Sequence, residues 1–148
     1  MANNMKKLLS VLSILLLSAC GTTDKLSTAL LNSGIPAGES RIIVSRKSDM
    51  LYVGAAAHVS VNGEQFASLG SGGQAMTDVK AGHLTVSVDG TGSFRSYKSE
   101  IDAKAGKTYS FLVSPNPTVG TFLGGTLGDA MTSSPEENAG FFKIERTK

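Results

Sequence analysis

Between residues 41 and 113, apolar and polar residues alternate in short runs that are separated by turn residues. An alternation with a period of two predicts half-buried strands, because successive side chains of a strand point to opposite faces. A final run at residues 141–146 has the same pattern. The pattern predicts an all-β domain, a single antiparallel β-sandwich of about seven to eight strands. The inward side chains are expected to be Ile42, Val44, Val59, Val61, Phe66, Leu84, Val86, Val88, Tyr109, Phe111, Val113, Phe142 and Ile144.

Turn residues set the expected ends of these strands. Asn62-Gly63 predicts a two-residue type I′ hairpin, whose central positions both need a positive φ. Gly82 and Gly106 are expected to close two further hairpins. Residues 94–103 are long and polar, which is typical of an edge strand. The remaining strands are expected at 41–46, 58–62, 64–69, 75–79, around 84–88, at 108–113 and at 141–146.

The apolar run Met50-Leu51-Tyr52-Val53 has no clean period and is bounded by Asp49 and Gly54. Short apolar runs are usually buried strands, so we favour a short strand that completes the sandwich. The alternative is an exposed loop that docks on a partner. For that reason Met50, Leu51 and Tyr52 are candidate interaction residues.

A second unusual stretch, residues 119–131, is rich in glycine. Gly120, Gly124 and Gly128 recur every four residues, a small-residue spacing that allows close helix packing. As a helix, thirteen residues would reach only about 20 Å, too short to span a bilayer. We favour a glycine-rich lid or loop on the sandwich over a self-associating or membrane-touching helix. The three glycines are therefore candidate interaction residues as well.

The first twenty residues have the layout of an export signal. Lys6 and Lys7 precede an apolar run at residues 8–17, which is too short for a membrane span. The ending Leu17-Ser18-Ala19-Cys20 resembles the bacterial lipobox, in which the cysteine is lipidated and the preceding peptide is removed. This resemblance implies a signal at 1–19, a lipidated tether at 20–40 and a sandwich domain at 41–148.

Composition narrows the possible partners. Of the 14 basic residues, Lys6 and Lys7 lie in the signal, which leaves 12 against 12 acidic residues in the mature chain. A nucleic-acid partner is not expected, because binding one requires a basic surface that neutralises phosphates. Cys20 is the only cysteine, so no internal disulfide can form.

Catalytic signatures are missing from the sequence. His58 and His83 are the only histidines, and neither has a partner at metal-ligand spacing. Both are expected to be solvated. Asp78, Asp89, Glu100 and Asp102 could meet in space, although carboxylates near strand ends are usually just solvated. We therefore expect no enzyme, no cofactor and no metal site.

Residues 41–113 resemble an uncharacterised family of small bacterial β-sandwich lipoproteins with a PEGA-like pattern. The matching segments are Val59–Gly63, Val79–His83, Ala105–Tyr109 and the glycine-rich stretch before a last strand. The family implies a non-enzymatic envelope protein and brings no catalytic residues. The expected partners are the membrane, through acyl chains on Cys20, and an envelope protein or peptidoglycan. The alternative function is a carbohydrate- or peptidoglycan-binding module, which exposed aromatics on one face would favour.

The residue after the lipidated cysteine predicts which of the two envelope membranes holds the protein. In enteric-type sorting an aspartate at that position retains a lipoprotein in the inner membrane, and here the position is Gly21. By resemblance to that rule, we expect the periplasmic face of the outer membrane.

Overall fold

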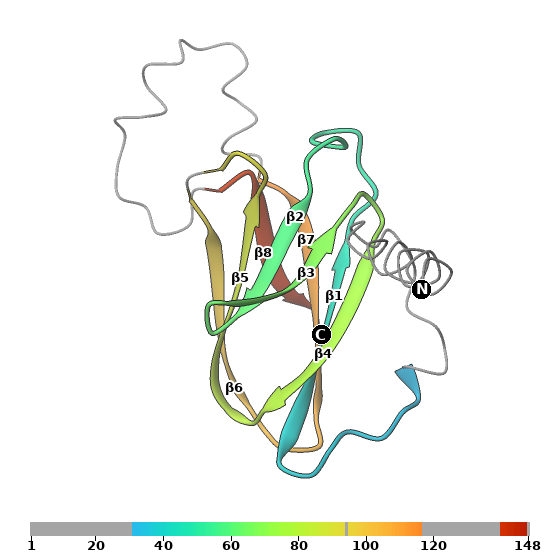
Figure 1. Cartoon of the computed structure of the whole chain (residues 1–148), viewed down its shortest axis with the longest axis vertical. Helices are drawn as coiled ribbons and strands as arrows, with labels where there is room; N and C mark the ends of the chain where they lie inside the picture. Colours follow the sequence, from blue (N-terminus) through green and yellow to red (C-terminus); the bar gives the residue numbers. More distant parts are fainter. Residues whose placement is uncertain (1–30, 94, 117–139, 148) are drawn as a thin grey trace, which may run out of the picture.

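The computed structural model describes residues 31–93, 95–116 and 140–147, which form eight strands in two packed sheets (Figure 1). One sheet has the strand order β4-β1-β7-β8 and the other β3-β2-β5-β6. The predicted all-β sandwich is confirmed. The strands are β1 (Glu39–Arg46), β2 (Ala57–Val61), β3 (Glu64–Leu69), β4 (Gln74–Lys80), β5 (Gly82–Gly90), β6 (Tyr97–Ala103), β7 (Thr108–Pro115) and β8 (Phe142–Thr147).

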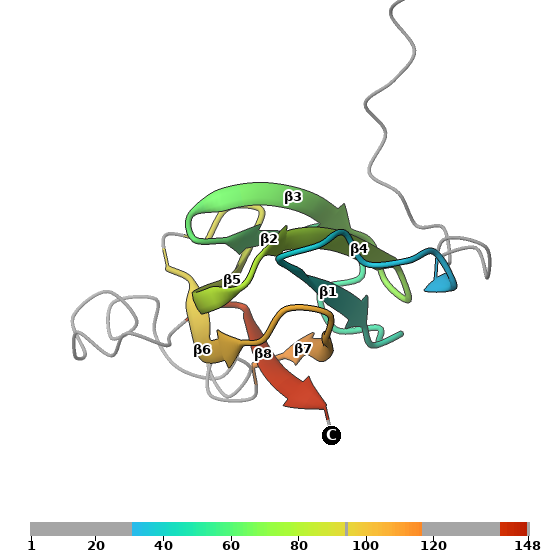
Figure 2. The same ribbon diagram turned by 90° about the horizontal axis from the view of Figure 1, so that it is seen from below.

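The core lies between the two sheets and draws on all strands except β4, which contributes partly buried residues. Every position predicted to face inward is buried, apart from Phe66, which is partly buried and packs against the core. The sandwich is nearly closed at its sides, because β6 lies beside β8 and β3 beside β4. Figure 2 shows the same strands from below, surrounding this common interior.

One pair of strands departs from the antiparallel expectation. β1 and β7 run parallel, with Ile42 opposite Tyr109 and Val44 opposite Phe111. The other ladders are antiparallel. Alternation along a strand fixes which face is buried but carries no information about the direction of a neighbour. The parallel pair arises because β7 enters its sheet, after crossing from β6, at the same end as β1.

Only one of the three expected hairpins forms. The strands β4 and β5, which meet at Gly82, lie in different sheets, and so do β6 and β7, which are joined through Gly106, so the expected hairpins at these two glycines are wrong. Both glycines do have a positive φ, of 142° and 73°, but a turn signal does not determine whether the next strand pairs with the one before it.

Asn62 and Gly63 have φ values of 51° and 84°, which fits the predicted type I′ hairpin between β2 and β3. Asn62 also accepts a hydrogen bond at Oδ1 from the backbone N–H of Thr85, at 2.9 Å. The predicted edge strand β6 does lie at an edge of its sheet, and it begins at Tyr97 rather than at residue 94.

The favoured interpretation of residues 50–53 as a strand is wrong. These residues form consecutive turns, with Val53 N–H donating to the Met50 carbonyl and Ala55 N–H to the Tyr52 carbonyl. The physical reason is that an arginine side chain, rather than a neighbouring strand, satisfies the carbonyls of this loop. Of the four residues in this apolar run, only Tyr52 packs against the core.

Two other sequence-based expectations fall outside the described residues. Cys20 and the glycine-rich segment, with Gly120, Gly124 and Gly128, belong to stretches that the structure does not describe. Among the described residues, no helix is long and apolar enough to cross a membrane.

Candidate functional site

Residues 50–55 form an exposed loop at one end of the sandwich, which we call the tip loop. Met50 is 90% exposed, Val53 60% and Leu51 37%. Exposed apolar side chains are common singly, but here three lie within four residues of one short loop. The loop lies at the top of Figure 1, at the end where β1 finishes.

Arg46, the last residue of β1, holds the tip loop against the domain. Its side chain is only 4% exposed. Nη2 donates to the Tyr52 carbonyl at 2.7 Å, while Nη1 donates to the carbonyls of Ala55 at 2.5 Å and Leu69 at 2.8 Å. The guanidinium also lies 4.4 Å from the centre of the Phe142 ring, a cation–π contact. Burial lowers the pKa of Arg46 from its usual value.

Tyr52 fixes the loop from the other side. Its ring stacks on Phe141 with the centroids 5.2 Å apart and meets Phe142 edge-on at 5.8 Å. Tyr52 has a φ of 57°, a left-handed conformation that a bulky residue keeps only when its surroundings hold it. The loop is therefore preorganised: its backbone and its one aromatic are fixed, while Met50 and Val53 face solvent.

The ends of the undescribed segment 117–139 meet at this same end of the molecule. The Asn116 side chain donates from Nδ2 to the Gly140 carbonyl at 3.0 Å, and its backbone N–H donates to the Phe141 carbonyl at 2.9 Å. Because Phe141 stacks on Tyr52, the chain leaves and re-enters the sandwich beside the tip loop. The described residues that flank the glycine-rich segment therefore lie beside the tip loop.

The two histidines have different surroundings. His58 is half-buried; its Nε2 lies 3.1 Å from Thr91 Oγ1, and its buried Nδ1 has no hydrogen-bond partner among the residues that the structure describes. The expectation that His58 is solvated is therefore met only in part. His83 is 64% exposed, as expected. Its Nδ1 lies 3.0 Å from Asp102 Oδ1 and its Nε2 3.8 Å from Glu100 Oε2.

The four carboxylates that could have met do not form one cluster. Asp102 and Glu100 flank His83 on one sheet, and the hydrogen bond that the His83 ring donates to Asp102 raises the pKa of His83. Asp89 lies opposite His58 on the same sheet, but Asp78 is on the other sheet and pairs with Arg41. Within the described part of the chain, no group of three histidine, cysteine or acidic residues is placed to hold a metal ion.

Arg41 joins the N-terminal segment to the sandwich. Its guanidinium forms a two-pronged ion pair with Asp78, with both N–O distances 2.8 Å. It also donates to the carbonyls of Leu31, Ser33 and Gly34 and to the Ser33 hydroxyl, at 2.7 to 3.4 Å. This cluster, the Arg41 clamp, therefore holds residues 31–34 on the domain, within the stretch that the sequence indicated as a tether. The hydrogen bond from Arg41 lowers the pKa of Asp78.

A basic groove lies at the opposite end from the tip loop. It has a volume of about 380 Å³ and is lined by Asp102, Lys104, Lys107, Thr108, Tyr109 and Arg146. The Arg146 guanidinium lies 4.8 Å from the centre of the Tyr109 ring. Sequence reasoning missed both this groove and the two buried arginines. In the sequence, only the two lysines that flank Ala105-Gly106 lie close together. Arg146 is some forty residues further along the chain, so its place in the groove could not be seen from the local sequence.

No protein-family model matches the chain, and a search of curated proteins finds no match either. The resemblance to PEGA-like lipoproteins therefore remains a prediction from the sequence.

Proposed function

We propose that this protein is a non-enzymatic lipoprotein of the bacterial envelope, anchored through Cys20, which binds a protein of the envelope with its tip loop. The anchor rests on the lipobox-like sequence Leu17-Ser18-Ala19-Cys20 after a basic and apolar leader. The preorganised apolar surface of Met50, Leu51 and Val53 is the observation that carries the binding role.

The tip loop has the properties that favour association. An interface gains affinity when its residues are ordered before binding, because less conformational entropy is then lost. Arg46 and Tyr52 provide that order, and Met50 adds a flexible, polarizable side chain that adapts to a partner surface. Apolar contacts of this kind also tend to form the dry centre of an interface.

A carbohydrate- or peptidoglycan-binding module is the alternative. The exposed large apolar residues in the described part of the chain are Leu31, Met50, Leu51 and Val53, none of which is aromatic. The tip loop therefore favours a protein partner over a sugar, since sugars are typically stacked on exposed rings.

The anchor is tested with Cys20→Ser. One acyl chain holds a protein only marginally, with a binding constant of about 10⁴ M⁻¹, whereas two or more hold it firmly. The variant should leave the membrane fraction or stay unprocessed. Processed Cys20→Ser protein that still sediments with membranes after a salt wash would refute lipid anchoring. Gly21 adds a second expectation, that the wild type fractionates with outer-membrane markers on a sucrose gradient.

The partner-binding role is tested by photocrosslinking in intact cells. A photoreactive residue at Met50 or Val53 should give one discrete crosslinked protein adduct. The matched control is Glu64, which is exposed in the β2–β3 hairpin, away from the tip loop. Arg46→Met should weaken the adduct formed from Met50, since the loop then loses its fixed backbone. Equal adducts from all three sites, or none from Met50 and Val53, would refute the proposed binding surface.

A further inference from the structure

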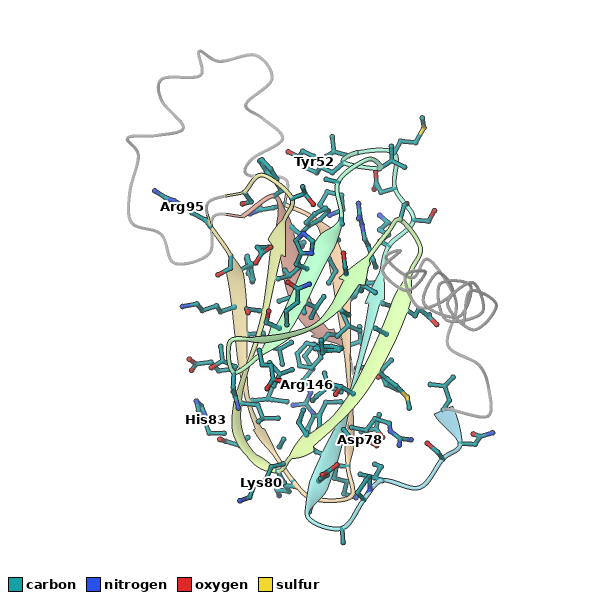
Figure 3. The ribbon with its side chains drawn as sticks, in the orientation of Figure 1. Tyr52, Asp78, Lys80, His83, Arg95 and Arg146 are labelled. Carbon is teal, nitrogen blue, oxygen red and sulfur yellow. The ribbon has the colours of Figure 1, made fainter. Side chains whose placement is uncertain are left out.

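The basic groove brings together cations from two separate parts of the chain. Lys104 and Lys107 lie in the turn between β6 and β7, and Arg146 is near the end of β8. The Tyr109 ring forms the floor beneath Arg146, and its hydroxyl accepts the Lys104 backbone N–H at 2.9 Å. Figure 3 shows Arg146 in the lower half of the domain, with His83 and Lys80 below and to the side, and Tyr52 at the far end.

The cations of the groove are unpaired, whereas its acid has a partner. Among the described residues, Lys104, Lys107 and Arg146 form no ion pair. Asp102 also lines the groove, but its carboxylate lies 3.0 Å from the His83 ring. The groove therefore carries three cations and one carboxylate around one open space, and this net positive charge is a favourable environment for an anion.

The groove also lies at the end of the domain where the N-terminal segment arrives. The Gly106 N–H donates to the Glu39 carbonyl at 2.7 Å, and the Arg41 N–H donates to the Lys107 carbonyl at 2.9 Å. The basic turn is thus bonded directly to the start of β1. The Arg41 clamp holds Leu31 nearby, and only eleven residue steps separate Leu31 from Cys20, a reach of at most about 40 Å.

We propose that the basic groove binds the phosphate headgroups of anionic lipids in the membrane that carries the anchor. A guanidinium suits a phosphate because it donates two parallel hydrogen bonds, and the lysines add compact positive charges. The inference rests on the proposed lipid anchor, because the anchor brings the groove within reach of a bilayer. Headgroup binding would fix which end of the sandwich faces the membrane and would leave the tip loop pointing away from it.

Vesicle sedimentation of unlipidated protein tests the groove independently of the anchor. The protein is the mature chain, residues 20–148, carrying Cys20→Ser. We expect it to bind phosphatidylcholine vesicles that contain about a third phosphatidylglycerol, and not vesicles of phosphatidylcholine. Each basic residue at an anionic surface adds about 1 kcal/mol to the binding free energy, so Lys104→Gln/Lys107→Gln should bind roughly 30-fold more weakly. Binding should also fall steeply as salt is raised.

The matched control is Lys47→Gln/Lys143→Gln, which removes the same charge from positions away from the groove. Its binding should stay close to that of wild type, and equal losses in the two double variants would refute the groove as the site. A saturable response of the Thr108 amide resonance to inorganic phosphate, without vesicle binding, would overturn the lipid assignment in favour of a free phosphate. Binding to peptidoglycan fragments in place of vesicles would overturn it as well. The two proposals fail separately. Loss of vesicle binding would overturn the groove and leave the anchor standing, whereas processed Cys20→Ser protein that stays on cell membranes after a salt wash would overturn the anchor, because salt removes binding through the groove.

Discussion

At the scale of single residues, two arginines on β1 carry much of the specificity of the structure. Arg41 and Arg46 are 3% and 4% exposed, yet they meet different surroundings. Arg41 has a carboxylate partner, whereas Arg46 is satisfied by carbonyls and an aromatic ring. A buried charge is retained only where hydrogen bonds replace the water that it loses. Both therefore mark points where the backbone outside the strands is held in place.

Replacing Arg46 with methionine should destabilise the domain by about 2–4 kcal/mol, because it removes the guanidinium donors to three carbonyls, those of Tyr52, Ala55 and Leu69, and the first of these keeps only the Ala55 N–H. Urea unfolding of wild type and variant measures the difference. The control is the adjacent Lys47→Met, whose side chain is 60% exposed and should change stability by less than about 0.5 kcal/mol. Equal stability of Arg46→Met and wild type would show that the carbonyls find other donors.

The Arg41–Asp78 pair predicts a loss of stability in acid. The hydrogen bond from Arg41 lowers the pKa of Asp78 below the usual value of an aspartate. The folded state therefore holds this proton less tightly than the unfolded state does. The stabilisation is complete above the unfolded pKa and is lost as pH falls through the lower folded pKa. Asp78→Asn should flatten this part of the acid limb in urea unfolding between pH 5 and pH 2.

At the scale of elements, strands were predictable from sequence and the connections between them less so. Val59-Ser60-Val61-Asn62-Gly63 encodes both a buried face and its turn, because alternation and positive φ are local properties. The Met50–Val53 run was misjudged because the donor to its carbonyls, Arg46, acts through tertiary contact. The groove escaped notice for the same reason, since Arg146 reaches Tyr109 only when β8 pairs with β7.

Gly140, just before β8, is required by a close approach of two segments. A Cβ at this position would lie 2.8 Å from the Arg95 carbonyl oxygen, which is backbone and cannot rotate away. Gly140→Ala should therefore lower the free energy of unfolding by about 1–3 kcal/mol, as overpacking typically does. Thermal melts check this, with Gly54→Ala as the control, because nothing lies within 4 Å of a Cβ there. A melting temperature equal to that of the control would show that the two segments separate without cost.

At the scale of the whole molecule, the sandwich has two different ends. The tip loop is apolar and fixed by Arg46, and the other end is basic and bonded to the start of β1. The strands between them are about 25 Å long at the usual rise per residue. A lipid anchor at Cys20 would make this polarity functional, because one end would then face the membrane and the other a partner.

The Arg41 clamp sets how far the domain can stand from its anchor. With residues 31–34 held, the chain from Cys20 to Leu31 reaches at most about 40 Å; with the clamp broken and the chain released up to β1, the limit rises to about 65 Å. Arg41→Gln should therefore move the domain outward. The measurement is energy transfer from a dye on Glu64→Cys, which would be the only free thiol in the lipidated chain, to acceptor lipids in a phosphatidylcholine bilayer.

A neutral bilayer is needed in that measurement so that the basic groove adds no attraction of its own. Transfer efficiency should fall in Arg41→Gln and also in Asp78→Asn, since either change removes one side of the ion pair that positions the guanidinium. Lys80→Gln is the control, because Lys80 is exposed at the end of the same strand as Asp78 and takes no part in the clamp. Unchanged efficiency in both clamp variants would mean that residues 31–34 do not limit the reach. The distance between the domain and the bilayer would then be set by the rest of the chain between Cys20 and β1.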